Sequence, residues 1–490
     1  MNYITPEKAG AASENIIKYI DKIESKRLAT HNIIMARGND IFFEKYWKPF
    51  NADFLHRMYS VSKSFVSLAI GILIQEGEIS LDDTMAKHFS EELKNQPDKN
   101  MHNQTVRDML MMSTAKPNRN WFSEKPKDRV KFYFENDIKE TRPAGTVFSY
   151  DSDGSFVLCA LVERITQKTL IEYLKEKLFD KIGVSDDIYC LKCPGGHSWG
   201  DSGIICKPTD LLKVARFVLD GGSFNGEQIL DRKYIENAVR NQIFINYEDI
   251  NDANTYGYGW QFWKTYEDSF YFNGMGCQYA VCVPKKDLIL IYNGDNQGKE
   301  NVRQCIIDSF FELIVNTVSD NPLPENAEAY NKLVKRTHSL ELICAKGEAH
   351  SDFQEEICDK VYKLSENPMK IEYIKLEIDG NTGRLFYRNR QGEKVLHFGM
   401  CKNVISDFPQ EGYSDECGTV EKKGSFYRCA ASAAWVEPKK LYIKVQIIDK
   451  YFGNLGITIG FKDNVCGLHM VKHAEAFLDE YQGFAGGRQS

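Results

Sequence analysis

The sequence predicts an α+β protein that is followed by a β-rich unit, and three patterns along the chain predict it. Apolar residues first recur at helical spacing, as in residues 7–29 and 60–75. After residue 256 they form short runs with turns between them, which is typical of an antiparallel meander. After residue 346 a further series of short runs is separated by Gly, Asn and Asp. The helical region lies between strands, so an antiparallel sheet with a helical insertion is expected.

The N-terminal elements are an amphipathic helix, a strand pair and an apolar helix. Residues 7–29 form the amphipathic helix. His31–Arg37 and Ile41–Tyr46 read as two strands around a turn at Gly38. The apolar helix runs from about Ser60 to Gln75 and should be buried, because its apolar residues share one face.

The middle of the chain is helix-rich and then changes to strands. A helical stretch from about 85 to 185 contains a helix at Ser155–Thr166, and a second helix at Thr209–Leu219 begins with a capping Thr. Four strands and a closing helix follow: Tyr256–Trp263, Ser269–Asn273, Tyr279–Val283, Leu288–Tyr292 and the helix Asn301–Val318. Strands from both ends of this segment should therefore form one sheet.

These elements predict two domains with a connection between them. Residues 1–320 form the α+β domain, and residues 321–345 are a linker and a helix, because Pro322 and Pro324 cannot continue the preceding helix. Residues 346–490 form a β-rich, barrel-like domain whose role the sequence does not indicate. Its predicted strands are Val361–Leu364, Ile371–Ile378, Arg384–Tyr387, Lys394–Phe398, Lys440–Ile448 and Leu455–Phe461.

Composition excludes several classes of partner. The chain has 62 Lys and Arg against 69 Asp and Glu, a net charge of −7, and no basic cluster, so no nucleic-acid partner is expected. No apolar run approaches the roughly 18 residues that a membrane span needs. The 13 cysteines are odd in number and scattered, and the N-terminal residues do not resemble a secretory signal, so a cytoplasmic location is expected.

Two Ser-x-x-Lys motifs are candidates for nucleophilic catalysis. In the first, Ser60 and Lys63 lie at the start of the apolar helix, where residues i and i+3 are one turn apart and the amine can reach the hydroxyl. In the second, Ser113 and Lys116 are followed by Pro117, which disfavours the helical turn that this contact requires. We therefore favour Ser60, although a Ser at this place is also a common helix cap.

Two further segments could contribute to a site around Ser60. Tyr150 lies where a loop meets the helix of residues 155–166, so its side chain could project into a cleft or anchor the helix to the core. Gly274 and Gly276 punctuate the entry to a strand, where glycine allows a ligand to approach the backbone closely.

Taken in order, these segments resemble the serine β-lactamase and penicillin-binding-protein superfamily. They are most similar to its class C β-lactamase-like serine hydrolases and esterases of the 6-aminohexanoate-dimer hydrolase type. The resemblance covers about residues 5–320 and includes Ser-x-x-Lys, the nucleophile motif of that superfamily. The matching segments are Tyr59–Phe65, Glu76–Asp83, Thr105–Leu110, Pro143–Tyr150, Tyr256–Trp260 and Gly274–Gln278.

The resemblance implies roles for residues at matching positions. Ser60 would be the acylated nucleophile and Lys63 its activating partner, and Tyr150 would stand where the family's second motif supplies a base or an acid. The backbone N–H groups of Ser60 and Met275 would form the oxyanion hole, beside Gly274. Which of Lys63 and Tyr150 takes the proton is left open.

Two positions depart from the family pattern. The second motif is usually Tyr-x-Asn, but Ser152 stands here in place of the amide. The third motif usually begins with Lys or His, but Phe272 occupies that position, so a substrate carboxylate would be unpaired, at a cost of roughly 1–3 kcal/mol if buried. Both departures disfavour β-lactams and acyl-D-Ala peptides and favour neutral esters or small amides.

Other motifs have simpler explanations. Gly200–Gly203 is similar to a trypsin-like nucleophile segment, but it lies before a helix and where the resembled family has a Gly-rich loop beside the cleft. Cys190 and Cys193 are half of a zinc-binding pattern without a second pair. Residues 466–473 contain one Cys and two His at ligand-like spacing without a clear fourth ligand, so no metal site and no cofactor are predicted.

The sequence thus predicts a serine hydrolase that acts through an acyl-enzyme on Ser60, with a small-molecule ester or amide as substrate. Three alternatives remain: a binding or sensing protein that keeps the fold and has lost turnover, a β-lactamase or D-amino-acid peptidase, and a protein whose functional part is a ligand-carrying or partner-binding C-terminal domain. The oligomeric state is not predicted.

Overall fold

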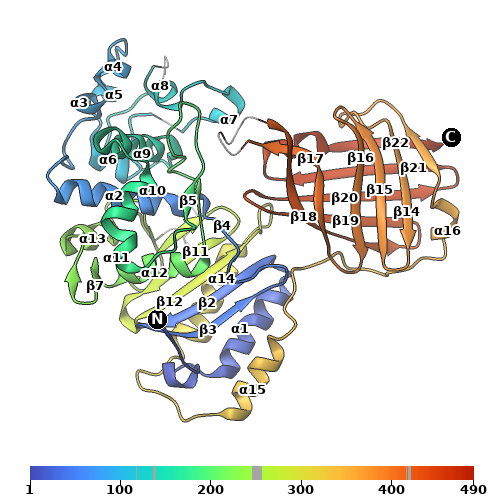
Figure 1. Cartoon of the computed structure of the whole chain (residues 1–490), viewed down its shortest axis with the longest axis horizontal. Coiled ribbons are helices and arrows are strands. Elements are labelled where there is room, and N and C mark those ends of the chain that lie inside the picture. The colour runs from blue at the N-terminus through green and yellow to red at the C-terminus, as the bar shows by residue number, and fades with distance from the viewer. Residues whose placement is uncertain (117, 136–139, 246–255, 415–416, 418–420) are drawn as a thin grey trace. The chain divides into compact units, whose positions relative to one another are not determined.

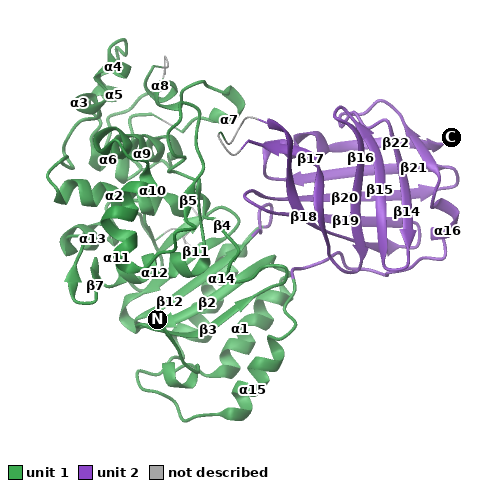
Figure 2. Ribbon diagram, in the orientation of Figure 1, with its two compact units in different colours: residues 1–294, 300–341, 415–418 green, residues 295–299, 342–414, 419–490 purple. Residues whose placement is uncertain are grey.

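The computed structural model describes residues 1–116, 118–135, 140–245, 256–414, 417 and 421–490 (Figure 1). These residues form two compact units (Figure 2). Unit 1 holds the described residues of 1–294, 300–341 and 415–418, and unit 2 holds those of 295–299, 342–414 and 419–490.

A seven-stranded sheet with the order β1-β3-β2-β12-β11-β10-β9 forms the centre of unit 1. The N-terminal hairpin meets the last strand of the unit, since β2 pairs with β12 in antiparallel register. The predicted sheet from both ends of the segment is therefore confirmed. The strands are β1 (Asn2–Tyr3), β2 (Thr30–Arg37), β3 (Asp40–Tyr46), β9 (Trp263–Lys264), β10 (Phe270–Gly274), β11 (Gln278–Val283) and β12 (Leu288–Gly294).

Helices cover both faces of this sheet, so its central strands are buried on both sides. On one face lie α1 (Ser13–Ser25), α14 (Val302–Phe310) with the π-helical turn η5 (Phe311–Val315), and α15 (Ala327–Arg336). α12 (Pro208–Leu219) packs on β2, β11 and β12. The amphipathic pattern of α1 explains its position, because its apolar residues at helical spacing all face this core: Ile16, Tyr19, Ile20 and Ile23.

Several predicted boundaries were wrong. The run Tyr256–Trp263 is not a strand; Tyr258 makes only isolated bridges and β9 begins at Trp263. The helix predicted within residues 321–345, over roughly 326–345, is shorter than expected and ends at Arg336. Thr209 does not cap α12, because Pro208 occupies the first helical position and Lys207 precedes it.

The helical insertion surrounds α2 (Ser62–Gln75), whose residues 62–73 are all buried. A helix that is buried on every side needs neighbours all around it, and α9, α10 and α13 pack against α2 (Figure 1). The helices are α3 (Met85–His88), α4 (Ser90–Leu93), α5 (Lys99–Asn103), α6 (Val106–Leu110), α7 (Trp121–Glu124), α8 (Arg129–Phe134), α9 (Ser152–Thr166), α10 (Leu170–Leu174), α11 (Asp180–Ile182) and α13 (Arg232–Val239).

A small sheet joins the start of α2 to a distant segment. It has the order β4-β6-β5 and consists of β4 (His56–Arg57), β5 (Tyr189–Cys190) and β6 (Ile204–Cys206). β4 lies shortly before α2, so this pairing brings the segment before β6 close to the N-terminus of α2. A two-stranded ribbon, β7 (Ser223–Phe224) and β8 (Glu227–Gln228), completes the strands of unit 1.

Unit 2 is a closed barrel, as the barrel-like prediction expected. Its sheet runs in the order β16-β15-β14-β13-β22-β21-β20-β19-β18-β17, and β16 also pairs with β18, which closes the ring. The strands are β13 (Val361–Leu364), β14 (Tyr373–Asp379), β15 (Thr382–Asn389), β16 (Gly392–Met400), β17 (Val404–Tyr413), β18 (Glu421–Glu437), β19 (Lys440–Ile448), β20 (Phe452–Lys462), β21 (Val465–His473) and β22 (Gly483–Gln489).

Alternation along these strands directs apolar side chains into the barrel. Buried and partly exposed residues alternate on β19 from Leu441 to Val445 and on β20 from Leu455 to Phe461. Large aromatic side chains pack at one end, where Tyr413 contacts both Tyr451 and Phe477. The barrel interior is therefore a packed core. A search of the described residues for a membrane-crossing helix gave none that is both long and apolar enough.

Unit 2 contains a buried carboxylate that makes its stability depend on pH. Asp295 accepts hydrogen bonds from the side chains of Gln297, at 2.9 Å, and Asn454. Burial raises the pKa of Asp295 from its ordinary value to about 6. The folded protein thus holds this proton more tightly than the unfolded chain, and its contribution to stability is lost as pH rises from about 4 through 6, by roughly 3 kcal/mol.

Asp295→Asn is expected to remove this loss. Urea unfolding, followed by fluorescence at about pH 4.5 and about pH 7.5, should show that the stability of the variant relative to wild type is greater by about 2 kcal/mol at the higher pH than at the lower pH. An equal difference in unfolding free energy at both pH values would contradict the prediction.

Candidate active site

Ser60 lies in a short 3₁₀ turn, η2 (Tyr59–Val61), directly before α2, and its side chain is partly exposed. The preceding residue, Tyr59, is buried and has a φ of 47°, in the left-handed region that a bulky residue rarely adopts. Such a backbone costs about 1–3 kcal/mol and persists because its surroundings fix it. The guanidinium of Arg57 lies 4.3 Å from the centroid of the Tyr59 ring. The strain is thus located at the residue that sets the direction of Ser60.

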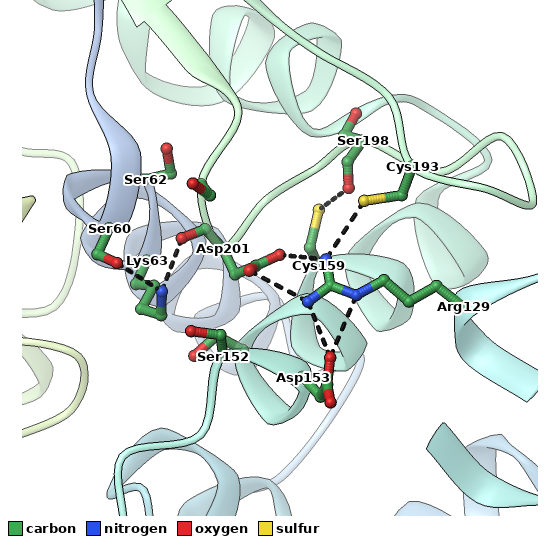
Figure 3. Close-up of polar contacts among 12 residues, drawn as sticks. Ser60, Ser62, Lys63, Arg129, Ser152, Asp153, Cys159, Cys193, Ser198 and Asp201 are labelled. Atoms are coloured by element: carbon green, nitrogen blue, oxygen red, sulfur yellow. Dashed lines mark hydrogen bonds and ion pairs between the residues drawn. The ribbon is translucent and has the colours of Figure 1, made fainter. Parts of the chain in front are cut away.

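Lys63 lies one turn after Ser60 and its amine contacts the serine hydroxyl. Its Nζ donates to Ser60 Oγ at 2.8 Å and to the main-chain oxygen of Asp201 at 2.7 Å (Figure 3). Only 2% of Lys63 is exposed. The i, i+3 contact predicted from the sequence is therefore present, and the Asp201 carbonyl gives the amine a second partner.

The pairing of β4 with β6 brings Asp201 to this position. The N–H of Met58 donates to the carbonyl of Ile204 at 2.8 Å, and the N–H of Ile204 donates to Ser62 Oγ at 3.0 Å. Ser62 is the first residue of α2, so the segment before β6 is joined to the same turn that carries the nucleophile candidate. The carbonyl of Asp201 consequently faces Lys63.

Tyr150 lies beside the same amine. It lies in the loop before α9, and Lys63 Nζ is 5.1 Å from the centroid of its ring. The ring stacks on Trp263, with centroids 5.7 Å apart and planes at 25°. Burial, followed by the proximity of Tyr150, raises the pKa of Tyr258 well above its ordinary value. The structure thus brings Ser60, Lys63 and Tyr150 together, and their roles stay predictions.

The turn between β10 and β11 lies against η2. Gly274 is the last residue of β10, and a Cβ there would lie 2.3 Å from the main-chain oxygen of Met58. Met275 is 47% exposed at the tip of the turn, and the side-chain amide of Gln278 donates to its carbonyl at 3.2 Å. Only glycine permits this close approach of β10 to the chain that leads into Ser60.

Two other predicted substrate residues have different surroundings. Phe272 is fully buried and packs edge-on against Phe262 at 5.0 Å between centroids. If Phe272 stands where the resembled family carries a cation, as the sequence comparison predicts, then an apolar side chain fills that position. Ser152 is partly exposed at the first position of α9, and its N–H donates to Asn118 Oδ1 at 3.0 Å. The substrate contacts of both residues remain predictions.

The sequence predicts that the second Ser-x-x-Lys motif forms no helical turn, and this prediction is confirmed for residues 113–116. Residues 113–116 are not helical, and Ser113 Oγ donates to the carbonyl of Asp108 at 3.1 Å. Lys116 is buried over the ring of Tyr133, at 4.1 Å from Nζ to the centroid, and burial lowers its pKa. Pro117 lies outside the described residues.

Residue types that bind metals do not converge in the part of the chain that the structure describes. There, no group of three or more His, Cys, Asp or Glu residues could hold an ion. On β21, Cys466 is buried while His469 stacks on Phe484 at 3.8 Å, so these two side chains lie on opposite faces of the strand.

A family model agrees with this arrangement. The model described as Beta-lactamase matches residues 18–303, which is more than half of the chain. The chain belongs to the beta-lactamase family. The matched region contains six of the seven strands of the sheet, α2 and the loops that carry the site, so this beta-lactamase-family chain is a serine hydrolase with the predicted fold.

The known proteins that resemble this chain in sequence or structure include two with hydrolase names. The 6-aminohexanoate-dimer hydrolase of Paenarthrobacter ureafaciens is 24% identical over 281 residues, which cover 54% of this chain and 71% of that protein. A Bacillus anthracis structure, provisionally assigned to the same hydrolases, has a TM-score of 0.53 at 20% identity and covers 62% of this chain and 83% of its own.

One similar structure also extends over the C-terminal region of this beta-lactamase-family chain. The octameric penicillin-binding protein homologue of Pyrococcus abyssi has a TM-score of 0.50 at 16% identity and covers 96% of this chain and 99% of its own. At this identity the likeness concerns the fold alone.

Sequence reasoning missed the residues that surround Lys63. Asp201 was placed in a loop beside the cleft, but nothing indicated that its carbonyl would hold an amine. Arg129 contacts the Asp201 carboxylate, and Asp153 contacts Arg129. Neither residue belongs to a sequence motif that indicates a functional site. The Gly200–Gly203 segment was the single clue, since a loop with glycine at both ends often passes close to other backbone.

Proposed function

We propose that this chain hydrolyses small esters or amides through an acyl-enzyme on Ser60. The observation that carries the proposal is the 2.8 Å contact between Lys63 Nζ and Ser60 Oγ at the N-terminus of a buried helix. A hydroxyl paired with a buried amine is the arrangement that activates a serine for nucleophilic attack. The 6-aminohexanoate-dimer hydrolase similarity supports the same reaction class.

In the proposed reaction Ser60 Oγ attacks the substrate carbonyl carbon, and its proton passes to Lys63 or to Tyr150. The oxyanion of the tetrahedral intermediate is stabilised by backbone N–H groups. Collapse expels the alcohol or amine, which takes up the proton, and leaves the acyl group on Ser60. Water then attacks this acyl-enzyme and releases the carboxylic acid with regeneration of the hydroxyl.

The preference for neutral substrates is supported by the apolar position in β10. Phe272 is buried against Phe262 where the family usually has a cation, so a substrate carboxylate would have no partner from that position. Apart from Lys63, the side chains around Tyr150 include aromatic ones: Trp263 stacks on the Tyr150 ring, and Tyr258 packs edge-on against Trp263. These surroundings favour uncharged acyl groups over β-lactam carboxylates.

Intact-mass analysis after incubation with a fluorophosphonate tests the nucleophile. The wild-type chain is expected to gain one adduct and Ser60→Ala none. Ser113→Ala is a matched control, because Ser113 belongs to the second Ser-x-x-Lys motif. This substitution should leave labelling of the protein unchanged. No adduct on wild type, or the same adduct on Ser60→Ala, would refute the proposal.

Substrate choice is tested on the same proteins with short-chain p-nitrophenyl esters, small amides and nitrocefin. Turnover of the esters with little hydrolysis of nitrocefin is expected. Labelling without turnover of any ester or amide would favour the binding or sensing alternative, and rapid nitrocefin hydrolysis without ester hydrolysis would show that the proposed substrate class is wrong.

A further inference from the structure

A buried ion cluster lies directly behind the amine of Lys63. The guanidinium of Arg129, which is 0% exposed, donates to the Asp201 carboxylate at 2.7 and 3.2 Å and to Asp153 Oδ1 at 2.9 and 3.3 Å (Figure 3). Asp153 and Asp201 are also buried. Burial alone would lower the pKa of Arg129, but the two carboxylates outweigh it and raise that pKa. The guanidinium therefore stays charged and holds both acids.

The position of the guanidinium is fixed on all sides. Its carbon lies 4.3 Å from the ring centroid of Phe156 and 4.5 Å from that of Trp121, and one nitrogen donates to Cys193 Sγ at 3.3 Å. Planar stacking between aromatic rings and bidentate pairing are properties of arginine that lysine does not share. The cluster joins three separate segments of unit 1, namely α8, the first turn of α9, and the loop before β6.

The loop that carries Asp201 is held by other contacts besides Arg129: the N–H of Ser202 donates to the carbonyl of Trp199 at 3.0 Å, and Arg57 Nε donates to the carbonyl of Ser202 at 3.1 Å. It lies between Gly200 and Gly203, and a Cβ at Gly200 would be 2.4 Å from Cys159 Cβ. Glycine at these places permits close packing but adds conformational freedom to the loop. Asp201 accepts hydrogen bonds from both sides: its carboxylate accepts from Arg129, and its main-chain oxygen accepts from Lys63 Nζ at 2.7 Å. Asp201 thus connects the buried cluster to the amine of Lys63.

We propose that Arg129 is a positioning residue, which fixes the carbonyl of Asp201 and thereby the amine of Lys63. Asp153 completes the cluster. It is the second residue of α9 and lies three residues after Tyr150, so it connects the cluster to the start of this helix. The proposal rests on the proposed hydrolysis through Ser60 and names what holds its activating partner in place. No proton or bond passes through Arg129.

Two substitutions at the cluster test this role. Arg129→Met is expected to lower kcat for a p-nitrophenyl ester and the rate of fluorophosphonate labelling by about 100-fold, because a misplacement of about 1 Å has that effect. KM should change less than about threefold, since Arg129 does not contact substrate. Arg129→Lys should recover little of the rate, because one ammonium cannot replace the bidentate contacts.

The pH dependence of labelling distinguishes positioning from a loss of stability. Arg129→Met removes a positive charge and Asp201→Asn a negative one, next to the site where the serine proton is taken up. A more negative surrounding holds a proton to higher pH. The pH midpoint of the labelling rate should therefore move up in Arg129→Met and down in Asp201→Asn. A merely structural defect would not produce opposite shifts.

A matched arginine elsewhere in unit 1 provides the control. Arg216, on α12, is nearly buried and pairs with Asp220 and Asp287. Arg216→Met should lower the melting temperature by less than Arg129→Met does, because Asp220 and Asp287 are partly exposed, and should leave kcat and the pH midpoint of labelling unchanged. If Arg129→Met does not fold, Asp201→Asn decides, because it keeps the volume of the side chain.

The two possible failures are distinguishable. Wild type that is not labelled at Ser60 refutes the proposed hydrolysis itself. Wild type that is labelled at Ser60, together with folded cluster variants whose kcat and pH midpoint match those of Arg216→Met, refutes the positioning role alone.

Discussion

Lys63→Met is expected to lower kcat/KM on ester substrates by about 10³-fold while the protein stays folded, because a positioned acid or base group contributes 10² to 10⁴. Methionine keeps the length and apolar stem of lysine but removes the amine that contacts Ser60 Oγ and the Asp201 carbonyl. The loss should be found in kcat, since Lys63 is buried and its contacts are within the protein. Steady-state kinetics and circular dichroism of both proteins check this result.

Two controls make the Lys63 experiment decisive. Lys213→Met removes a lysine of α12 that pairs with Asp210 at 3.4 Å, and it should leave kcat/KM unchanged. Lys63→Arg keeps the positive charge but cannot lose a proton near neutral pH, so it should be as inactive as Lys63→Met if Lys63 takes the serine proton and should keep part of the activity if Tyr150 takes it. A Lys63→Met variant within about tenfold of wild type would show that Lys63 is not required, because general acid–base groups contribute more than that.

Gly274→Val is expected to reduce kcat by about 10² to 10³, the effect of losing one oxyanion-hole donor. A side chain at this position would start 2.3 Å from the carbonyl oxygen of Met58, which is main chain and cannot rotate away. β10 must therefore move away from η2, and the N–H groups of Ser60 and Met275 would separate. We also expect the melting temperature to fall by several degrees, since a small-to-large change in a packed site costs about 1–3 kcal/mol.

Gly467→Val on β21 is the matched control for this substitution. A Cβ at Gly467 has no atom within 4 Å, so a valine there meets open space. Its kcat should equal that of wild type. If Gly274→Val retained more than about a third of wild-type kcat, the proposed pair of N–H donors would be contradicted, because a lost donor costs at least 10²-fold.

Most elements of unit 1 could be predicted because their pattern is local. The amphipathic spacing of Ile16, Tyr19 and Ile23 predicts α1, and a glycine turn between two β-branched and aromatic runs predicts the β2–β3 hairpin. The predicted helix over Ser60–Gln75 is confirmed, with the difference that its first turn is the 3₁₀ turn η2.

Four strands of unit 2 were not predicted, and their composition explains this. β18 contains the run Ala430–Ala434, which is four alanines and a serine, and β22 contains three glycines within Gly483–Gly487. Alanine and glycine have low intrinsic preference for strands. Pairing with β19 and with β21 makes these segments strands, since closure of the barrel requires them. β17 and β21 also lacked a clear signal.

The contacts of the candidate site also fall into two groups, those that follow from the local sequence and those that depend on the tertiary structure. The contact between Ser60 and Lys63 follows from the sequence, because residues three apart on one helix are neighbours whatever surrounds the helix. The carbonyl that holds Lys63 comes from Asp201, 138 residues away, and is brought there by the pairing of β4 with β6. Arg129 reaches the Asp201 carboxylate across a further 72 residues. Local helical geometry is contained in a few consecutive residues, whereas the direction of a distant carbonyl and the burial of an ion cluster depend on how separate segments pack, which only the tertiary structure decides.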